Sequence, residues 1–397
     1  YSITTGMHKH YSAINKKLKE KFDFLSVFGG MHASFFPDFI HEDYVDVICI
    51  GEGEYALLEL VDNIEKNKSI NKIKNLWIKD KDKIYKNPLR PLIKNIDELP
   101  FPDRELVYRY KAPQKNLVLK NFITTRGCPY RCSYCFNDGF FDMYKINGER
   151  RVRSRSADNV IEEILEVKKR YGLKIVYFQD DIFSLNENFK ELMIKYSNEV
   201  GHPFHAHIRP DLVNEETIKL LKLGGCLSVT MSLESANEDT RKLIRRGLTK
   251  EQIYNAANLL HKYDIKFRLE NMLGLPHENL DDSFATLEMN IKFKPALGWA
   301  SIFQPYPGTE LFNYTLENDL FNGDINSFDG SFFNSSVLNL KEKNRIENLQ
   351  KLFSFTVSFP ILKPLTKQLI KLPSNRTFNF IHDKWKTHCF SKKLYAV

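Results

Sequence analysis

"NFITTRGCPYRCSYCFN", residues 121–137, places a short apolar strand directly before a loop that holds three cysteines. Cys128, Cys132 and Cys135 are half of the six cysteines in the chain, and their spacing is C-x3-C-x2-C. Three thiolates on one short loop can converge on one metal centre. A structural zinc site needs a fourth ligand close by, but no cysteine or histidine follows Cys135 until His202. In a four-iron cluster, three thiolates leave one iron open to a substrate or cofactor.

The cysteine loop opens a long stretch in which strands and helices alternate. The predicted strands, which are separated by helices, cover 121–125, 174–178, 204–208, 227–233, 266–273 and 298–303. Six successive strand–helix units predict an α/β fold, with a parallel sheet curled into a partial (β/α)6 barrel. Ligands are then expected at the carboxyl ends of the strands, where the loops gather.

Helix boundary signals support this pattern. Asp158 is the expected N-cap of a helix over 157–172, and Gly172 is expected to end it. Thr249 and Gln252 are expected to form a capping box at the start of a later helix. The predicted buried face of that later helix consists of Ile253, Ala256, Ala257 and Leu260.

Four domain-level segments are expected. Residues 1–74, with two glycine-terminated strands each followed by a helix, indicate part of a doubly wound domain. Residues 75–117 indicate a polar hairpin and a proline-containing linker, residues 118–325 the barrel, and residues 326–397 a helical extension with a basic, aromatic end. Because the sequence starts inside an expected strand, we predict that the N-terminal domain is truncated.

Composition narrows the class of protein. The formal net charge of +8 comes from lysines scattered among acidic residues, without an arginine-rich aromatic run, which argues against nucleic-acid binding. No apolar run reaches the length that a transmembrane helix needs. The remaining cysteines, Cys49, Cys226 and Cys389, lie far apart and suggest no disulfide framework, so we predict a cytoplasmic protein.

The cysteine spacing resembles the cluster loop of the radical S-adenosylmethionine (SAM) superfamily. The resemblance extends over residues 118–325 and is strongest to the subfamily that carries an N-terminal cobalamin-binding domain. The segments that carry it are "FQDDIFSLN" (178–186), "HIRPDLVNEETIKLLKLGGCLSVTMSLESANEDTRKLIRRGLTKEQ" (207–252), "NMLGLPHENLDDS" (271–283) and "FQPYPGTELF" (303–312).

The resemblance implies cofactors and site residues. In the family, three cysteines hold a 4Fe–4S cluster whose open iron binds SAM, and one electron cleaves SAM to methionine and a 5′-deoxyadenosyl radical. A strand-end acid such as Glu234 can bind the amino group or ribose of SAM, and Arg246 can pair with its carboxylate. The candidate SAM contacts are Tyr134, Asp180, Arg209, Glu234 and Arg246. The resemblance singles out no catalytic residue in this chain.

Cobalamin is a further candidate cofactor. Glycines at strand ends let a backbone approach a bulky ligand, and by resemblance four of them face cobalamin: Gly29, Gly30, Gly51 and Gly53. The D-x-H-x-x-G string, whose histidine binds cobalt in many relatives, does not occur in this sequence. His8 and His10 stand in a different context and are expected to be exposed.

The leading hypothesis is therefore a radical SAM enzyme that transfers a methyl group to an unactivated carbon with the help of cobalamin. The first alternative is a radical SAM enzyme without cobalamin that catalyses cyclisation, carbon–carbon coupling or another rearrangement. An alternative of another class is a non-enzymatic zinc- or RNA-binding protein. The expected partners are an electron donor such as flavodoxin or ferredoxin, and a small-molecule or lipid-like substrate.

Overall fold

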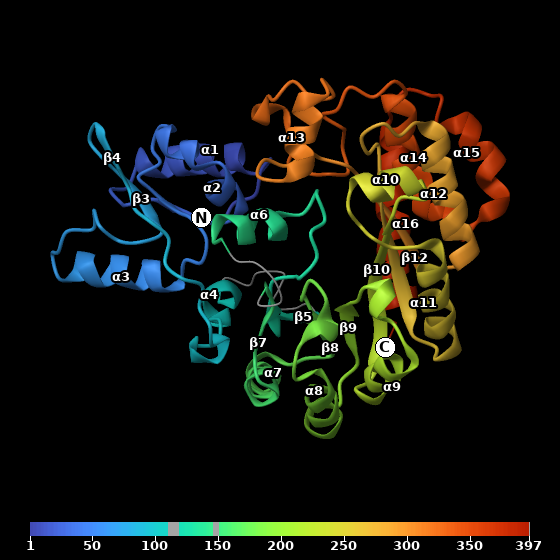
Figure 1. Ribbon diagram of the computed structural model, residues 1–397, viewed down its shortest axis with the longest axis horizontal. Helices are drawn as coiled ribbons and strands as arrows, with labels where there is room; N and C mark the ends of the chain where they lie inside the picture. The colour runs from blue at the N-terminus through green and yellow to red at the C-terminus, as the bar shows by residue number, and fades with distance from the viewer. Residues whose placement is uncertain (110–118, 146–150, 397) are drawn as a thin grey trace. The chain divides into compact units, whose positions relative to one another are not determined.

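The computed structural model describes residues 1–109, 119–145 and 151–396, and it divides the chain into two compact units (Figure 1). The first unit comprises Tyr1–Ile93, Arg131–Asn147 and Gln304–Asn339. The second unit comprises Lys94–Tyr130, Gly148–Phe303 and Leu340–Val397. The chain passes from one unit to the other several times, so these units do not follow the predicted boundaries at residues 74 and 325.

The second unit is built on a six-stranded sheet in which every neighbouring pair of strands is parallel. In sheet order the strands are β12 (Leu297–Ile302), β11 (Lys266–Leu273), β10 (Cys226–Glu234), β9 (Phe204–His207), β8 (Ile175–Phe178) and β5 (Leu119–Phe122). Strands β12 and β5 are the two edges of the sheet. The predicted α/β fold with an open, partial barrel is therefore confirmed.

Helices separate these strands along the chain and form the remainder of the unit. They are α4 (Arg104–Tyr108), α7 (Ala157–Tyr171), α8 (Phe189–Lys195), α9 (Glu215–Leu223), α10 (Glu238–Leu243), α11 (Lys250–Lys262), α12 (Leu280–Phe293), α14 (Lys343–Ser358), α15 (Lys363–Leu369) and α16 (Arg376–Cys389). Short helical turns are η2 (Ile96–Glu98), η4 (Phe183–Leu185), η5 (Tyr196–Val200), η6 (Pro210–Leu212), η8 (Pro360–Leu362) and η9 (Phe390–Leu394).

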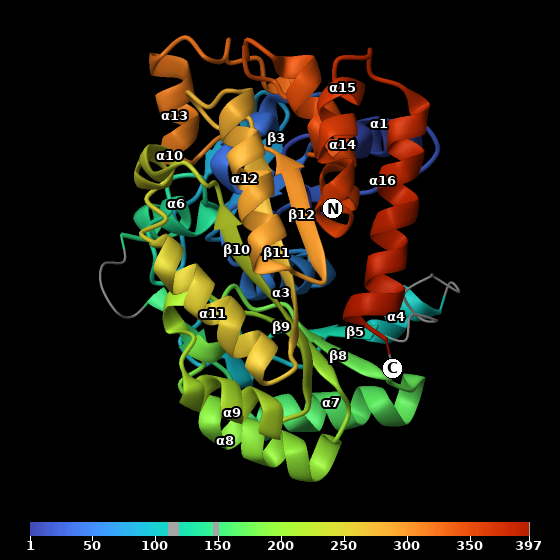
Figure 2. The same ribbon diagram turned by 90° about the vertical axis from the view of Figure 1, so that its right-hand side faces the viewer.

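One face of the sheet is covered by α7, α8, α9 and α11 (Figure 2). Apolar and polar side chains alternate along the strands, and the apolar ones, such as Phe178, Ala206 and Val229, share a buried core with these helices. Fully burying one large apolar side chain contributes about 1.5–3 kcal/mol. Because side chains alternate along a strand, the residues between these core residues must lie on the opposite face of the sheet.

The first of the predicted strands ends earlier than expected. Strand β5 stops at Phe122, and Thr125 instead pairs with Ser154 in a short antiparallel ribbon of β6 (Thr125–Arg126) and β7 (Arg153–Ser154). The backbone N–H groups of Thr124 and Thr125 both donate to the carboxylate of Asp180. The chain leaves the sheet at this point because the N–H groups of Thr124 and Thr125 bond to the Asp180 side chain and not to the backbone of a neighbouring strand.

The helix boundary predictions are confirmed with one correction. Thr249 and Gln252 form the expected capping box of α11, and Gly172 ends α7 with a φ of 69°. The N-cap of α7 is Ser156, whose side chain accepts a hydrogen bond from the N–H of Asn159, so the assignment of this cap to Asp158 is wrong. Asp158 lies instead in the first turn, where a carboxylate also suits the helix dipole.

The first unit contains a mixed four-stranded sheet in the order β1 (Val27–Phe28), β2 (Val47–Cys49), β3 (Leu76–Asp80) and β4 (Lys83–Lys86). The pair β1–β2 is parallel, whereas β3 and β4 form the predicted hairpin, which adds antiparallel to β2. The helices and helical turns of this unit are α1 (His8–Lys19), α2 (Met31–Phe35), η1 (Pro37–His41), α3 (Glu54–Glu65), α6 (Phe136–Met143), α13 (Glu310–Glu317) and η7 (Ile325–Ser327).

The two N-terminal histidines differ in exposure. His8 is buried: its ring stacks on that of His32 with centroids 4.3 Å apart, and its Nε2 lies 3.5 Å from Oδ1 of Asn326. His10 is exposed. The prediction that both are exposed is therefore wrong for His8, because its partners come from distant parts of the chain.

None of the helices in the described part of the chain combines the length and apolar character needed to cross a membrane.

Candidate cofactor site at the strand ends

Four predicted SAM contacts belong to the second unit and lie after neighbouring strands of its sheet. Asp180 follows β8, Arg209 follows β9, Glu234 is the last residue of β10, and Arg246 follows α10. The carboxyl ends of parallel strands meet at one edge of a sheet, which is where such folds bind ligands. The structure joins three of these side chains in one group and holds Asp180 at the start of the cysteine loop.

Arg209 is the centre of that group. Its buried guanidinium lies 3.6 Å from the ring centroid of Tyr130, the residue midway between Cys128 and Cys132. Its Nε donates to Oδ2 of Asp211 (3.1 Å), which also accepts from the hydroxyl of Tyr130 (3.3 Å). Burial, and then the charge of Asp211, raise the pKa of Tyr130 above its ordinary value. Arg209 therefore holds part of the cysteine loop in place.

Glu234 and Arg246 face each other. The Nε of Arg246 lies 4.0 Å from Oε1 of Glu234, and both side chains are largely buried. The backbone carbonyl of Arg246 accepts a hydrogen bond from Nη2 of Arg209, which connects this pair to Tyr130. The sequence-based prediction thus selected residues that are neighbours in space, although their contact with SAM stays a prediction.

The backbone of Glu234 is strained. Its φ is 65°, a left-handed conformation that a non-glycine residue adopts at a cost. The register between β10 and β11 also shifts between Ser232 and Glu234. Beyond the strand, two carbonyls, those of Ser235 and Ala236, accept hydrogen bonds from the buried guanidinium of Arg241, each at 2.9 Å. These contacts brace the backbone directly after Glu234.

Asp180 is an anchor for the residues that lead into the cysteine loop. It is 1% exposed, and its Oδ1 accepts hydrogen bonds from the backbone N–H and the hydroxyl of both Thr124 and Thr125. Asn186 also donates to the hydroxyl of Thr124 at 3.0 Å. Burial raises the pKa of Asp180 to about 6, although the hydrogen bonds from the two threonines act in the opposite direction. Only Oδ2, which has no hydrogen-bond partner among the described residues, is left for another contact.

The raised pKa of Asp180 gives a stability prediction. The folded protein holds this proton more tightly than the unfolded chain, whose carboxyl has a pKa of 3.8. The stabilisation from Asp180 is therefore complete below about pH 4 and is lost as the pH rises through 6. Relative to Asp180→Asn, which cannot ionise, the unfolding free energy of the wild type is expected to fall by about 2 kcal/mol between pH 4 and 7.

Thermal unfolding of both proteins, followed by circular dichroism across this pH range, measures the difference. Asp181→Asn is the matched control, because Asp181 is the exposed neighbour of Asp180. A difference between wild type and Asp180→Asn that does not change with pH would contradict the assigned pKa.

The three cysteines of the loop are reduced and belong to both units. Cys128 lies in the second unit and is half-buried, whereas Cys132, which is buried, and Cys135, which is half-buried, lie in the first. Cys135 is the N-cap of α6. Among the described residues, no three His, Cys, Asp or Glu side chains are gathered closely enough for a single metal ion. The ligand roles of the three cysteines therefore stay a prediction that rests on their spacing.

The remaining predicted contacts lie in the first unit. Tyr134 is half-buried, in the position directly before Cys135. Gly30 and Gly51 have φ angles of 90° and 77°. A Cβ at Gly30 would lie 2.7 Å from the backbone carbonyl oxygen of Ile3, and one at Gly51 would meet the ring of Tyr144. The chain's own packing therefore already explains these two glycines.

Gly29 and Gly53 are less restricted. A Cβ at Gly29 would make only ordinary contacts with Cys49, the nearest at 3.7 Å, and one at Gly53 would lie 3.1 Å from the sulfur of Cys49. Of the four predicted cobalamin glycines, Gly29 is therefore the one whose conformation and surroundings leave room beside the backbone.

The face of the sheet opposite the helices is polar. Tyr177, His205 and His207 alternate with core residues, and the hydroxyl of Tyr177 lies 2.7 Å from Nε2 of His207. His205 is satisfied by Ser228 and Thr230, with ring nitrogen to hydroxyl distances of 2.7 and 2.8 Å. Burial lowers the pKa of His207 to about 4, so this histidine is neutral at pH 7.

The C-terminal end of the chain contacts this polar face. The ring of Tyr395 lies 5.2 Å from that of His205, and the ring of Phe390 lies 5.7 Å from that of Trp299 on β12. Beside them the buried guanidinium of Arg268 pairs with Glu270 at 2.7 Å. The face therefore offers hydrogen-bonding and aromatic groups with little net charge.

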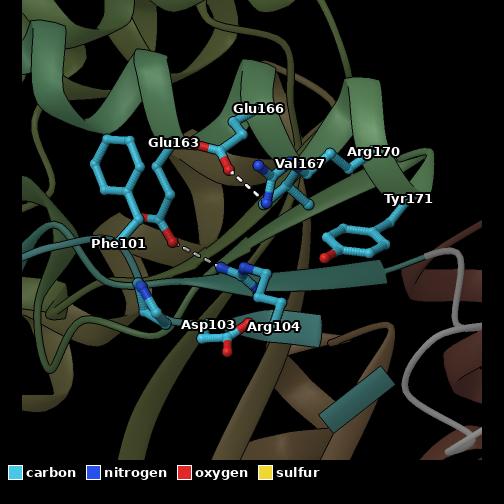
Figure 3. A pocket seen from close by; sticks show the side chains of 9 residues that line it. Phe101, Asp103, Arg104, Glu163, Glu166, Val167, Arg170 and Tyr171 are labelled. Atoms are coloured by element: carbon cyan, nitrogen blue, oxygen red, sulfur yellow. Dashed lines mark hydrogen bonds and ion pairs between the residues drawn. The ribbon is translucent and has the colours of Figure 1, made fainter. Parts of the chain in front are cut away.

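A pocket of about 210 Å³ lies elsewhere in this unit, between the residues that precede α4 and the helix α7 (Figure 3). Its charged side chains pair with each other: Arg104 with Glu163 at 2.8 Å, and Arg170 with Glu166 at 3.1 Å. None of the predicted cofactor residues lines it. We interpret it as a contact between the linker and the barrel that these ion pairs stabilise, and not as a ligand site.

Sequence reasoning missed three side chains that shape the strand ends. Tyr130 and Asp211 hold Arg209, and Glu278 accepts a hydrogen bond from the hydroxyl of Ser235, directly after Glu234. Burial raises the pKa of Glu278 to about 7. The position of Glu278 shortly after a strand of the barrel was a visible signal, whereas the roles of Tyr130 and Asp211 depend on contacts across the fold.

Comparison with known proteins identifies the family. A model described as the Radical SAM superfamily matches residues 122–289. Over 325 residues the chain is 30% identical to an uncharacterized methyltransferase of Pyrococcus horikoshii, PH0819, and the alignment covers 80% of this chain and 69% of that protein. The chain belongs to the radical SAM superfamily. Radical SAM membership confirms the predicted 4Fe–4S cluster and SAM as cofactors, and it replaces the zinc- or RNA-binding alternative with an enzyme that needs a reductant.

Two further similarities concern longer proteins. The chain is 24% identical over 325 residues to the anaerobic magnesium-protoporphyrin IX monomethyl ester cyclase of Rubrivivax gelatinosus, covering 78% of this chain and 57% of the cyclase. Its fold matches the cobalamin-dependent S-adenosylmethionine radical enzyme OxsB, solved with aqua-cobalamin bound, with a TM-score of 0.68 and 18% identity over 98% of this chain and 62% of OxsB. This radical SAM chain thus spans less than two thirds of either protein.

Proposed function

We propose that this radical SAM enzyme transfers a methyl group from SAM to an unactivated carbon, with cobalamin as the methyl carrier. The observation that carries the proposal is the 30% identity to a protein named a methyltransferase over 80% of this chain. The likeness of the fold to a cobalamin-dependent enzyme supports the choice of carrier. Radical chemistry suits such a carbon because it offers no acidic proton to a base.

The strand-end group has the chemistry to hold SAM. When bound, the cluster and SAM supply a 5′-deoxyadenosyl radical, which removes a hydrogen atom from the substrate. We assign Arg246 to the carboxylate of SAM and Glu234 to its amino group or ribose. Arg209 positions Arg246 through its backbone carbonyl and positions the cysteine loop through Tyr130. SAM and the cluster loop would therefore be oriented by one connected set of side chains.

We assign the substrate to the part of the polar face of the barrel sheet that Phe390 and Tyr395 leave uncovered, next to the strand ends. Neutral His207 and its partner Tyr177 suit an uncharged, partly aromatic or otherwise bulky molecule. Because Glu270 and Arg268 neutralise each other, they can offer hydrogen bonds without selecting a net charge. Substrate binding there would also exclude water from the reacting carbon.

Cyclisation is the second candidate function. Its support is the similarity to the Rubrivivax gelatinosus protein, which is named a cyclase. Both reactions would begin with removal of a hydrogen atom from the substrate. They differ in what joins the substrate carbon, because ring closure uses an atom of the substrate itself and methyl transfer uses an atom of SAM.

Isotope labelling distinguishes the two reactions. We expect the anaerobically purified chain, loaded with cobalamin and supplied with a reductant, a metabolite extract and SAM bearing a trideuterated methyl group, to form a product that carries the heavy methyl. Mass spectrometry detects it, and 5′-deoxyadenosine and S-adenosylhomocysteine should appear together with it. Cys132→Ala is the control and should form none of the three. A product without the label would contradict methyl transfer and favour cyclisation.

A further inference from the structure

The final 39 residues, 359–397, carry almost all of the net charge of the chain. They contain eight Lys or Arg and a single acidic residue, Asp383, so their formal net charge is +7, compared with +8 for the whole chain. The cofactor site described above uses none of these charges. The concentration of positive charge in residues 359–397 is therefore not explained by cofactor binding.

Large apolar side chains are exposed in the same segment. Ile361 is 86% exposed, Leu365 52% and Leu372 48%. They are spaced by four and seven residues along η8, α15 and the turn that follows, so they share one side of this helical stretch. The opposite side is buried against α14, where the hydroxyl of Thr366 lies 2.8 Å from that of Thr356. We call Ile361, Leu365 and Leu372 the C-terminal patch.

Basic side chains accompany the patch. Three lysines follow one another on α15 and its end at four-residue spacing: Lys363, Lys367 and Lys371. Helix α16, which also packs on α14, adds Phe380, 61% exposed, with the ammonium of Lys384 at 5.7 Å from its ring centroid. Helix α15 lies on the outer side of α14 (Figure 1). Lys363 pairs with Glu288 at 2.6 Å, whereas the exposed Lys367, Lys371 and Lys384 present their charges to the solvent together with the apolar groups.

We propose that the C-terminal patch binds the surface of a membrane that contains anionic lipids. Exposed apolar side chains flanked by lysines match such a surface, because the apolar groups enter the acyl boundary while the ammonium groups meet lipid phosphates. Charge complementarity selects this partner: helix α3 exposes Leu57 and Leu58 by 50% and 59%, but it carries three glutamates and one aspartate and no basic residue. Membrane binding by the C-terminal patch does not depend on which reaction the enzyme catalyses.

Vesicle flotation of the full chain tests the proposal. We expect the wild type to float with vesicles of equal parts phosphatidylglycerol and phosphatidylcholine, and not with phosphatidylcholine alone. Ile361→Ser combined with Leu365→Ser should abolish flotation. Lys367→Gln and Lys371→Gln should each weaken vesicle affinity about fivefold, the effect of one lysine at an anionic surface. Leu58→Ser, an equally exposed leucine among carboxylates, is the matched control and should bind as the wild type does.

Three results would overturn the proposal. The first is a folded wild type that does not float with the anionic vesicles. The second is unchanged flotation of the Ile361→Ser and Leu365→Ser double variant. The third is a concentration-dependent dimer in analytical ultracentrifugation that the same double variant abolishes, which would make a second copy of the chain the occupant of the patch.

Discussion

Replacement of Cys132 by alanine is expected to remove the iron–sulfur absorbance of the purified protein and to reduce 5′-deoxyadenosine formation from SAM to background. The expectation follows from the ligand count: two thiolates cannot hold a four-iron cluster that normally has three or four. The same loss is expected for Cys128→Ala and Cys135→Ala. Iron and sulfide analysis after anaerobic reconstitution, together with chromatography of the nucleoside product, provides the measurement.

Cys226→Ala is the matched control for these cysteine variants. Cys226 is buried outside the loop, and burial raises the pKa of its thiol, so we do not expect it to bind the cluster. Its variant should keep the cluster and the nucleoside product. Normal 5′-deoxyadenosine formation by any of the three loop variants would remove that cysteine from the ligand set.

Loss of either member of the Glu234–Arg246 pair is expected to weaken SAM binding strongly. Glu234→Gln and Arg246→Gln should each cost about 1.5–3 kcal/mol, or roughly a 10- to 150-fold rise in the dissociation constant, which is typical of a lost charge-assisted hydrogen bond. The cluster should still assemble, because neither residue is a metal ligand. Anaerobic titration calorimetry measures the affinity.

Arg245→Gln is the control for this pair. Arg245 precedes Arg246 but is exposed, so its loss tests whether the general positive charge of the loop is enough to explain the binding. Wild-type affinity is expected for this variant. If Glu234→Gln and Arg246→Gln also bind SAM with wild-type affinity, their ion pair serves only to hold the strand ends together.

The sequence predicted the architecture well where local signals agree with the final packing. The apolar strands, the Thr249–Gln252 capping box and the buried face of α11 all depend on neighbours within a few residues. The N-cap of α7 was misassigned because Ser156 and Asp158 are both good capping residues, and only the backbone geometry shows that the helix starts earlier. His8 was misjudged for a different reason, since its burial depends on His32 and Asn326.

The sequence was enough to predict which residues form the candidate site, but not which hydrogen bonds and ion pairs join them. The family resemblance pointed to Asp180, Arg209, Glu234 and Arg246, and three of these four lie in one connected group. The structure adds a role for Asp180 that the resemblance did not suggest, because its Oδ1 accepts four hydrogen bonds from Thr124 and Thr125, while its contact with SAM stays a prediction. Such a role depends on two segments 55 residues apart meeting at the strand ends, which no local pattern reveals.

We expect SAM to bind the cluster of the cysteine loop through the strand-end group around Arg209. Electron paramagnetic resonance of the reduced, reconstituted protein with and without SAM tests it most directly. SAM is expected to change the cluster signal of the wild type and of Arg245→Gln, and at the same SAM concentration this change should be lost in Arg246→Gln. A cluster signal that SAM leaves unchanged in the wild type, or that changes equally in Arg246→Gln, would contradict it.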